Sequence, residues 1–313
     1  MGITDKWYVV CNPIAQGGKM KLRWPEVKKT LEKNGILFDW TFTTHNNHAI
    51  EITRSKISEG YRKFIVIGGD GSINEVINGF FTQDEVDYQD LLLALIPLGT
   101  ANDWARTHKL PRDITKAVKN IVDGHIEKQD IGLVSFEKNG KQESRYFNNV
   151  AGMSYDAYVA KYIEDHGNRK MNKLKYIYYV LYCLFMFKLP ETKVQSEDLN
   201  YCGKAYTINV GICKYNGGGL RLVPQALAND GKFALTVAKE LSKLAVIMNM
   251  YRFYTGTIGE LKKVITVNTG DIMVEQSGDE KVMLEVDGEF MGYAPSKFTL
   301  FPSALSFISN SPK

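Results

Sequence analysis

The stretch from Phe64 to Phe81 contains a glycine-rich turn, with one carboxylate and one hydroxyl, at a point where a strand is expected to pass into a helix. Four apolar residues before the glycines predict a buried strand, and the apolar residues that follow have helical spacing. Glycine permits positive φ and close approach of a ligand, and amide groups at a helix start attract an anion. A phosphate site is therefore predicted at Gly68, Gly69, Asp70, Gly71 and Ser72.

A second interpretation of this segment is a tight strand-to-helix turn in which Ser72 or Asp70 caps the helix. The pattern is neither G-x-G-x-x-G nor a P-loop, so it specifies neither a dinucleotide site nor a Walker fold. Because its carboxylate would repel a phosphate, Asp70 is expected to act through a cation or to bond a ribose or backbone group.

The first half of the chain repeats a strand followed by a helix. Helices are expected near Leu22 to Asn34 and Ala49 to Gly60, and Pro13 ends the first strand. Such repeats predict a doubly wound parallel α/β sheet, whose ligands lie at the carboxyl ends of its strands. Asn12, Asp70 and Thr100 all lie at this end of an expected strand. The expected strands are Trp7 to Cys11, Leu37 to Thr44, Phe64 to Ile67 and Leu91 to Ile96.

After about Asp130 the apolar residues alternate with period two, which indicates a largely antiparallel β domain. We expect a linker at Gly124 to Asp130, an α/β domain at 1–128 and a β-rich domain at 129–313, with a C-terminal end free to pack back on the first domain. The expected strands are Tyr206 to Tyr215, Phe233 to Ala238, Val264 to Asn268, Ile272 to Glu275, Val282 to Val286 and Lys297 to Phe301.

Composition narrows the class of protein. The chain has 313 residues, is 44% hydrophobic and 24% charged, and is therefore expected to be globular. Its 39 basic and 35 acidic residues are too balanced to indicate nucleic acid as a partner. The four cysteines have no C-x-x-C spacing, and the first residues do not resemble a signal peptide, so a cytoplasmic protein is expected.

An apolar, aromatic stretch with basic flanks, Lys173 to Lys188, interrupts the β pattern. Its apolar core of about 12 residues is shorter than the roughly 20 that a bilayer requires. The stretch can lie on an anionic membrane surface, line an acyl-chain groove, or form an ordinary buried helix. Its basic residues are Arg169, Lys170, Lys173, Lys175 and Lys188.

Five motifs follow one another in order: GGDGSINEVING, PLGTANDWAR, NNVAGMSYDAYV, GGGLRLVPQALANDGK and VDGE. Their order and spacing resemble the diacylglycerol kinase catalytic-domain family, which includes bacterial soluble lipid kinases and sphingosine and ceramide kinases. The resemblance extends from Asn12 to Glu289 and beyond. It implies ATP-dependent transfer of a phosphoryl group to a lipid hydroxyl. It also implies that the α/β domain at 1–128 is the nucleotide-binding domain, that the β-rich domain at 129–313 is a β-sandwich lipid-substrate domain, and that the active site lies in the interdomain cleft.

The resemblance also implies roles for individual residues. The segment from Gly68 to Asn74 looks like the family's nucleotide-phosphate loop, and Thr100 and Thr43 look like further ATP contacts. Asp70 and Asp103 would serve a magnesium network, because Mg²⁺ neutralises charge during phosphoryl transfer; the alternative for Asp103 is a helix N-cap. The implied nucleotide contacts are Asn12, Thr43, Gly68, Gly69, Asp70, Gly71, Ser72, Asn74, Thr100 and Asp103.

In similar bacterial kinases a structural Mg²⁺ lies near an Asp-Gly pair, which here is Asp230 and Gly231. The Asp230 carboxylate and the carbonyl groups of Leu227 and Lys232 would supply oxygen ligands. Read without the family, Asp230 and Gly231 form a hairpin turn. Glu289 would accept the proton of the lipid hydroxyl and, with Asp70, is a candidate catalytic residue.

The sequence departs from the family pattern at two places. Ser72 replaces the usual threonine and keeps the hydroxyl, and Ala15-Gln16 replaces the commoner Ser-Gly, so a backbone contact is expected there. The leading function is phosphorylation of diacylglycerol or a related lipid. The alternatives are a sphingoid-base or ceramide kinase, an NAD kinase-like enzyme, and a non-catalytic lipid-binding module. The expected partner is lipid at a membrane surface, reached by peripheral contact, and homodimerisation stays open.

Overall fold

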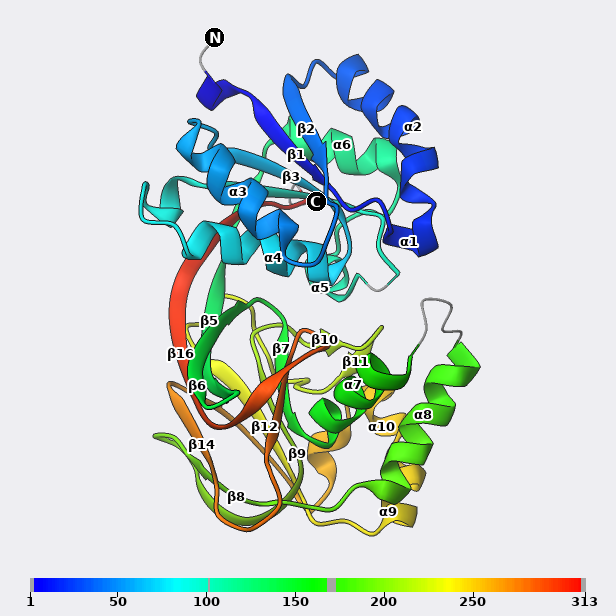
Figure 1. The fold of residues 1–313 in the computed structure, drawn as a ribbon, viewed down its shortest axis with the longest axis vertical. Helices are drawn as coiled ribbons and strands as arrows, with labels where there is room; N and C mark the ends of the chain where they lie inside the picture. Colours follow the sequence, from blue (N-terminus) through cyan, green and yellow to red (C-terminus); the bar gives the residue numbers. More distant parts are fainter. Residues whose placement is uncertain (1–2, 101, 168–172, 311–313) are drawn as a thin grey trace. The chain divides into compact units, whose positions relative to one another are not determined.

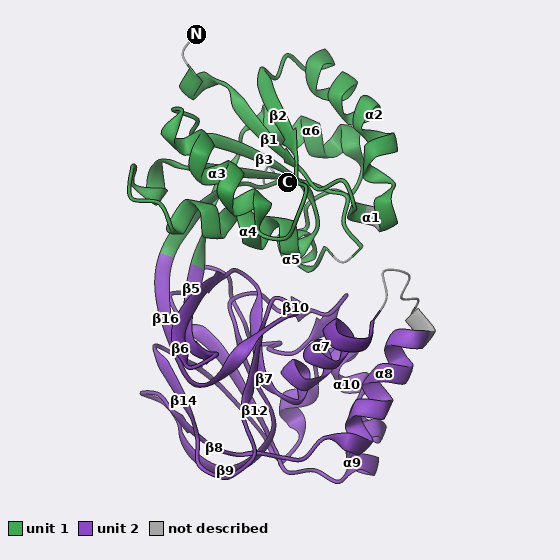
Figure 2. Ribbon diagram, in the orientation of Figure 1, with its two compact units in different colours: residues 1–130, 303–313 green, residues 131–302 purple. Residues whose placement is uncertain are grey.

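The structure is a computed structural model that describes residues 3–100, 102–167 and 173–310. The chain divides into two compact units (Figure 2). Unit 1 contains residues 1–130 and 303–313, and unit 2 contains residues 131–302. Each unit is described by itself below.

Unit 1 is built on a parallel sheet with the strand order β16-β4-β3-β1-β2 (Figure 1). The strands are β1 (Trp7–Cys11), β2 (Phe38–Phe42), β3 (Lys63–Gly68) and β4 (Leu92–Pro97), and the last part of β16 (Glu289–Ile308) completes the order. The helices are α1 (Ala15–Gly18), α2 (Met20–Lys33), α3 (His48–Ser58), α4 (Asp70–Phe81), α5 (Asp103–Thr107) and α6 (Ile114–Asp123).

Helices cover both faces of this sheet, because alternate residues of each strand are apolar on opposite faces. Val9 and Ile65 pack with Trp24 of α2 and Val118 of α6. On the other face, Phe64 contacts Phe80 of α4, with ring centroids 5.2 Å apart. The doubly wound fold predicted for this half of the chain is confirmed.

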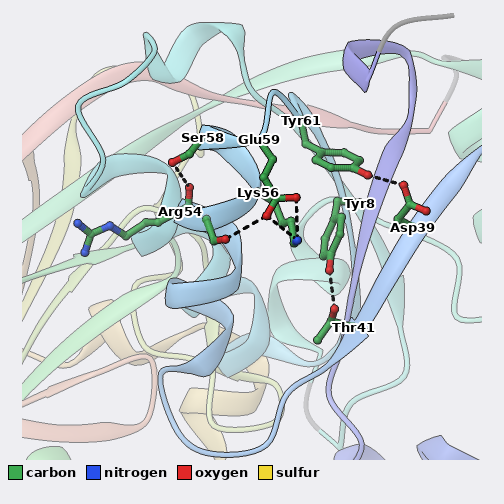
Figure 3. A network of polar contacts seen from close by, with 9 residues as sticks. Tyr8, Asp39, Thr41, Arg54, Lys56, Ser58, Glu59 and Tyr61 are labelled. Carbon is green, nitrogen blue, oxygen red and sulfur yellow. Dashed lines mark hydrogen bonds and ion pairs between the residues drawn. The ribbon is translucent and has the colours of Figure 1, made fainter.

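A polar network holds β1, β2 and α3 together away from the carboxyl ends of the strands (Figure 3). The Tyr61 hydroxyl donates to Asp39, and this hydrogen bond, together with Lys6, lowers the pKa of the Asp39 carboxyl. Lys56 donates to Glu59 at 2.7 Å and lies over the ring of Tyr8. The network therefore fixes the packing of α3 on the sheet without using the glycine-rich segment.

The expected linker at Gly124 to Asp130 is instead structured. Gly124 ends α6 in a left-handed conformation, and β5 (Ile126–Lys138) begins two residues later. Gln129 and Asp130 are fully buried, and Asp130 accepts a hydrogen bond from the Ser303 amide at 2.7 Å. The segment does lead from unit 1 into unit 2, whose boundary follows Asp130, but most of it is a strand in which Gln129 and Asp130 are buried, and it is not a loop.

Unit 2 is mainly antiparallel, and its strands form a sandwich. Two long strands, β9 and β16, each pair with strands of both layers. Strand β9 pairs with β7 and β12 and, at its other end, with β8. Strand β16 pairs with β15 and also with β14. The strands not yet given are β6 (Lys141–Phe147), β7 (Val150–Ser154), β8 (Glu191–Gln195), β9 (Asn200–Gly211), β10 (Tyr215–Asn216), β11 (Leu220–Arg221), β12 (Phe233–Lys239), β13 (Val264–Thr269), β14 (Ile272–Gln276) and β15 (Met283–Val286).

The core of unit 2 lies between these sheets and contains Phe147, Phe233 and Phe298. The predicted strand from Tyr206 to Tyr215 ends early, at Gly211, because the next two amides both donate to the carbonyl of Asn149 and leave the ladder. The helices are α7 (Tyr155–His166), α8 (Lys173–Met186), α9 (Lys243–Asn249) and α10 (Tyr251–Thr255). The predicted fold class, α/β followed by an antiparallel sandwich, is confirmed.

Candidate functional site

In unit 1, polar groups gather where β1, β2 and β3 end. The Asn12 amide donates to the Ile67 carbonyl at 3.0 Å, and the Thr43 amide donates to the Cys11 carbonyl at 2.9 Å. These backbone bonds bring Asn12 and Thr43 to the edge of the sheet where Gly68 follows β3. Parallel pairing brings these residues together because it aligns the carboxyl ends of neighbouring strands.

Gly68 has to be glycine because the first turn of α4 packs directly on it. A Cβ atom on Gly68 would collide with the Ser72 hydroxyl oxygen. Asn12 Nδ2 donates to Ser72 Oγ at 3.1 Å, so the hydroxyl hydrogen of Ser72 can be donated elsewhere. Gly69 occupies the N-cap of α4 and has no side chain to cover the amides of the first turn. Amides and a hydroxyl at the start of a 12-residue helix suit a phosphate group.

Asp70, in the first motif, is hydrogen-bonded to the second motif. Its carboxylate accepts the amides of Asp103 and Trp104, each at 3.0 Å, and so caps α5 from outside that helix. Asp103 is only 2% exposed and pairs with Arg106 at 3.1 Å. Asp70 therefore fulfils the expected bond to a backbone group. Each of its oxygens keeps a further lone pair, so a water-mediated contact to Mg²⁺ is compatible with this arrangement.

The second motif forms a closed loop beside α5. Asn102 exchanges hydrogen bonds with the backbone of Gly99, at 3.1 and 2.9 Å. Thr100 lies exposed within this loop, and its neighbour Ala101 lies outside the described residues.

Asn74 differs from the other predicted nucleotide contacts. It is buried and bonds Asn78 one turn along α4, so the structure gives Asn74 a place in the packing of the helix.

In unit 2, the last motif is a turn between β15 and β16. Asp287 has φ of 49° and shares two hydrogen bonds with Val150, one through its carboxylate and one through its amide, both at 3.1 Å. Glu289 is the exposed first residue of β16. The turn is thus anchored to β7 through Asp287, which leaves Glu289 as the outward carboxylate of the motif.

Two buried carboxyl groups that the sequence analysis missed lie behind this turn. Glu285 is 2% exposed and accepts the Gly288 amide at 2.6 Å. Asp156, on α7, accepts the Thr207 hydroxyl. A Cβ on Gly152 would lie 2.5 Å from Glu285 and 3.1 Å from Asp156, so both approach one point of β7. Burial raises the pKa of both carboxyls, and that of Glu285 is raised well above its usual value.

Strand periodicity would have placed Glu285 on a solvated face, because its neighbours Leu284 and Val286 point into the sandwich core. Helix α7 covers that other face and buries it. The signal that could have identified these two carboxyl groups is their position in or beside the ordered motifs. Asp156 lies in the third motif, Asn216 immediately precedes the fourth and bonds Glu285 at 3.3 Å, and Glu285 immediately precedes the fifth.

Asp230 forms an Asx turn. Its carboxylate accepts the Lys232 amide at 3.1 Å, and Gly231 takes a φ of 72°. Asp230, Leu227 and Lys232 are all exposed. In the described part of the chain, no group of three His, Cys, Asp or Glu side chains is arranged to hold a metal ion. A single carboxylate with nearby carbonyls still suits a hard cation that keeps several of its waters.

Comparison with known proteins identifies the class of this two-unit architecture. Residues 6–134 match the diacylglycerol kinase catalytic domain. Residues 149–309 match the YegS C-terminal NAD kinase beta sandwich-like domain. The chain belongs to the diacylglycerol kinase catalytic-domain family, and this confirms the resemblance drawn from the motifs.

Individual relatives support the same conclusion. Diacylglycerol kinases of Staphylococcus carnosus and Staphylococcus saprophyticus are each 30% identical over 294 residues, which is 93% of this chain and 90% of theirs. A putative diacylglycerol kinase from Bacillus anthracis has the same fold, with a TM-score of 0.77 at 23% identity over 99% of this chain and 97% of that one. The protein is accordingly a kinase of this lipid kinase family.

Proposed function

We propose that the protein transfers the γ-phosphoryl group of ATP to the hydroxyl of diacylglycerol or a related lipid. The observation that supports it best is the phosphate-binding arrangement at the start of α4, where Gly68, Ser72 and Asn12 present a hydroxyl and uncovered amides. Thr43 and Thr100 are the proposed further contacts to the nucleotide. Asn74 contributes by holding α4 in place.

In the proposed reaction Glu289 takes the proton of the lipid hydroxyl, whose oxygen forms a bond to the γ-phosphorus. The bond between that phosphorus and the bridging oxygen breaks, and ADP leaves with the electron pair. Mg²⁺, bound with the nucleotide, would neutralise phosphate charge, and Asp70 and Asp103 are its proposed neighbours. A separate structural Mg²⁺ is proposed at Asp230 and the carbonyls of Leu227 and Lys232.

The proposed setting is the cytoplasmic side of a membrane, with peripheral contact to the lipid. In the described part of the chain, no helix combines the length and the hydropathy needed to cross a bilayer. The similar staphylococcal proteins are named diacylglycerol kinases, which favours diacylglycerol as the acceptor over a sphingoid base or ceramide. The sandwich domain matched by residues 149–309 is named for its likeness to NAD kinase, so NAD is the second candidate substrate.

The deciding experiment is ATP turnover over a panel of acceptors: diacylglycerol, sphingosine, ceramide, phosphatidylglycerol and NAD. We expect ADP release with a phosphorylated product from diacylglycerol, and a Glu289→Gln protein serves as the matched control. Turnover with NAD alone would replace the proposal by the second candidate. Nucleotide binding without turnover of any acceptor would leave a lipid-binding module.

A further inference from the structure

Three helices of unit 2 leave an exposed apolar face. On α8, the side chains of Tyr178, Phe185 and Met186 are 60%, 55% and 53% exposed. Leu244 and Met248 of α9 and Tyr251 of α10 are 67%, 66% and 55% exposed. These six side chains define what we call the exposed apolar face. Large apolar side chains gathered in this way mark a binding surface more often than isolated ones do.

The helices that carry this face lie side by side (Figure 1). Lys243, the first residue of α9, donates to the Phe185 carbonyl at 2.5 Å and lies over the Phe185 ring. On their inner sides, Leu184 of α8 belongs to a buried cluster against which the partly buried Val246 of α9 packs. One side of each helix thus packs against the core of unit 2. That packing does not explain why the opposite, exposed side is also apolar.

Charge distinguishes this face from an ordinary surface. Residues 173–188 and 242–259 contain no Asp or Glu, although they contain lysine and arginine. The described basic side chains include Lys175 and Lys243, whereas the side chain of Lys173 and residues Arg169 and Lys170 lie outside what the structure describes. Lys188 and Arg252 pair with acidic residues outside these segments, Glu280 and Glu260.

We infer that the exposed apolar face of α8, α9 and α10 binds the surface of an anionic lipid bilayer. Apolar and aromatic side chains enter the boundary between head groups and acyl chains, and lysines beside them meet the negative head groups. With 14 residues, α8 is too short to span a bilayer and suits a position in the plane of its surface. The inference rests on the proposed function, because it names where the enzyme meets the membrane that holds its substrate.

Vesicle co-sedimentation tests the inference without any catalysis. The full chain is mixed with vesicles of phosphatidylcholine alone or with phosphatidylglycerol, at low and high salt. We expect binding that requires phosphatidylglycerol and weakens with salt. The double change Leu244→Ser and Met248→Ser should lower the partition coefficient by about tenfold or more, because two exposed apolar side chains are lost. Leu22→Ser, at an 82% exposed site on α2, is the matched control and should change nothing.

Two results would overturn the inference. The first is vesicle binding that ignores both the double change and the content of anionic lipid. The second is a wild-type dimer, seen by light scattering after size-exclusion chromatography, that the double change converts to monomer, since the face would then bind a second copy. Circular dichroism verifies that the variants are folded. If no acceptor is turned over but vesicles are still bound through this face, the proposed function fails while the surface stands.

Discussion

At the scale of single residues, Glu285 and Glu289 have the same side chain but different surroundings, and this gives them different roles in the proposed mechanism. They are four residues apart, yet Glu289 is exposed whereas Glu285 is enclosed by β7, α7 and the turn that follows it. An exposed carboxylate can meet a substrate. A buried one that accepts the Gly288 amide instead fixes the turn from which Glu289 projects. Glu285 is therefore a positioning residue in the proposed mechanism.

The first prediction concerns the proposed base. A Glu289→Gln side chain is nearly the same size but cannot accept the proton, so kcat should fall by a factor of roughly 10² to 10⁴ while ATP affinity stays nearly unchanged. Steady-state kinetics and nucleotide-binding calorimetry measure the two quantities. Asp287→Asn is the matched control, because its side-chain oxygen can still accept the Val150 amide. More than about a tenth of wild-type kcat in the Glu289→Gln protein would exclude Glu289 as the base.

The second prediction uses the raised pKa of Glu285. When the native pKa lies above the unfolded one, the unfolded chain releases its proton first as pH rises, so the free energy of unfolding decreases through that interval. Glu285→Gln stays neutral at every pH and keeps an acceptor for Gly288. Its stability should therefore depend less on pH, at pH values above the ordinary glutamate pKa of about 4.3, than that of wild type, with a residual slope from Asp156.

Denaturant unfolding at several pH values measures this slope. Glu285→Ala separates charge from hydrogen bonding, since it leaves the Gly288 amide without its acceptor and should be less stable than Glu285→Gln by about 1 to 3 kcal/mol at every pH. Equal slopes for wild type and Glu285→Gln would show that Glu285 does not retain its proton in the native protein.

At the scale of elements, α5 depends on a residue that belongs to α4. Asp70→Ala should lower the free energy of unfolding by about 2 kcal/mol, because the amides of Asp103 and Trp104 lose a charged acceptor. Urea denaturation followed by tryptophan fluorescence measures this loss. Asp70→Asn keeps one carbonyl oxygen and should lose less.

Activity separates the two roles of Asp70. If Asp70→Asn is almost as stable as wild type but inactive, the carboxylate also serves the nucleotide and its Mg²⁺. If both variants match wild type in stability, the cap on α5 is not important for folding. Loss of stability in proportion to loss of activity would instead assign Asp70 a structural role alone.

Local sequence predicted the elements better than their polar connections. The apolar runs of β1, β3 and β4 and the motif order were sufficient for the fold class and for the strand-end cluster around Asn12 and Gly68, because period and glycine placement are local signals. The bond from Asp70 to α5 joins residues 33 positions apart. The burial of Glu285 depends on α7 lying over β15, and sequence periodicity carries no information on such coverage.

At the scale of the whole molecule, unit 1 is built from both ends of the chain. Residues Ser306 and Phe307 of β16 pair with β4, and the Ser309 amide donates to the His125 carbonyl at 2.9 Å. Phe307 is fully buried, with its ring centroid 5.0 Å from Trp104 and 4.4 Å from His108. The C-terminal strand is therefore part of the core beside α5.

The fourth prediction tests this assignment. Phe307→Ala should destabilise unit 1 by about 3 to 5 kcal/mol, because it leaves a cavity against Trp104. The four tryptophans, Trp7, Trp24, Trp40 and Trp104, all lie in unit 1, so their fluorescence follows the unfolding of that unit. Phe185→Ala, at an exposed position of unit 2, is the control. An unchanged fluorescence midpoint would show that β16 is dispensable for unit 1.

The position of β16 also bears on how the protein is made. A chain is synthesised from its N-terminus to its C-terminus, and N-terminal domains commonly fold first during synthesis. Here the sheet that carries the glycine-rich segment lacks the strand beside β4 until every other strand and helix described above has been translated. A nascent chain that stalls before Ser303 would carry the glycine-rich segment on a sheet that lacks this strand. We therefore expect the first unit to reach its full stability only after translation has passed through the second unit.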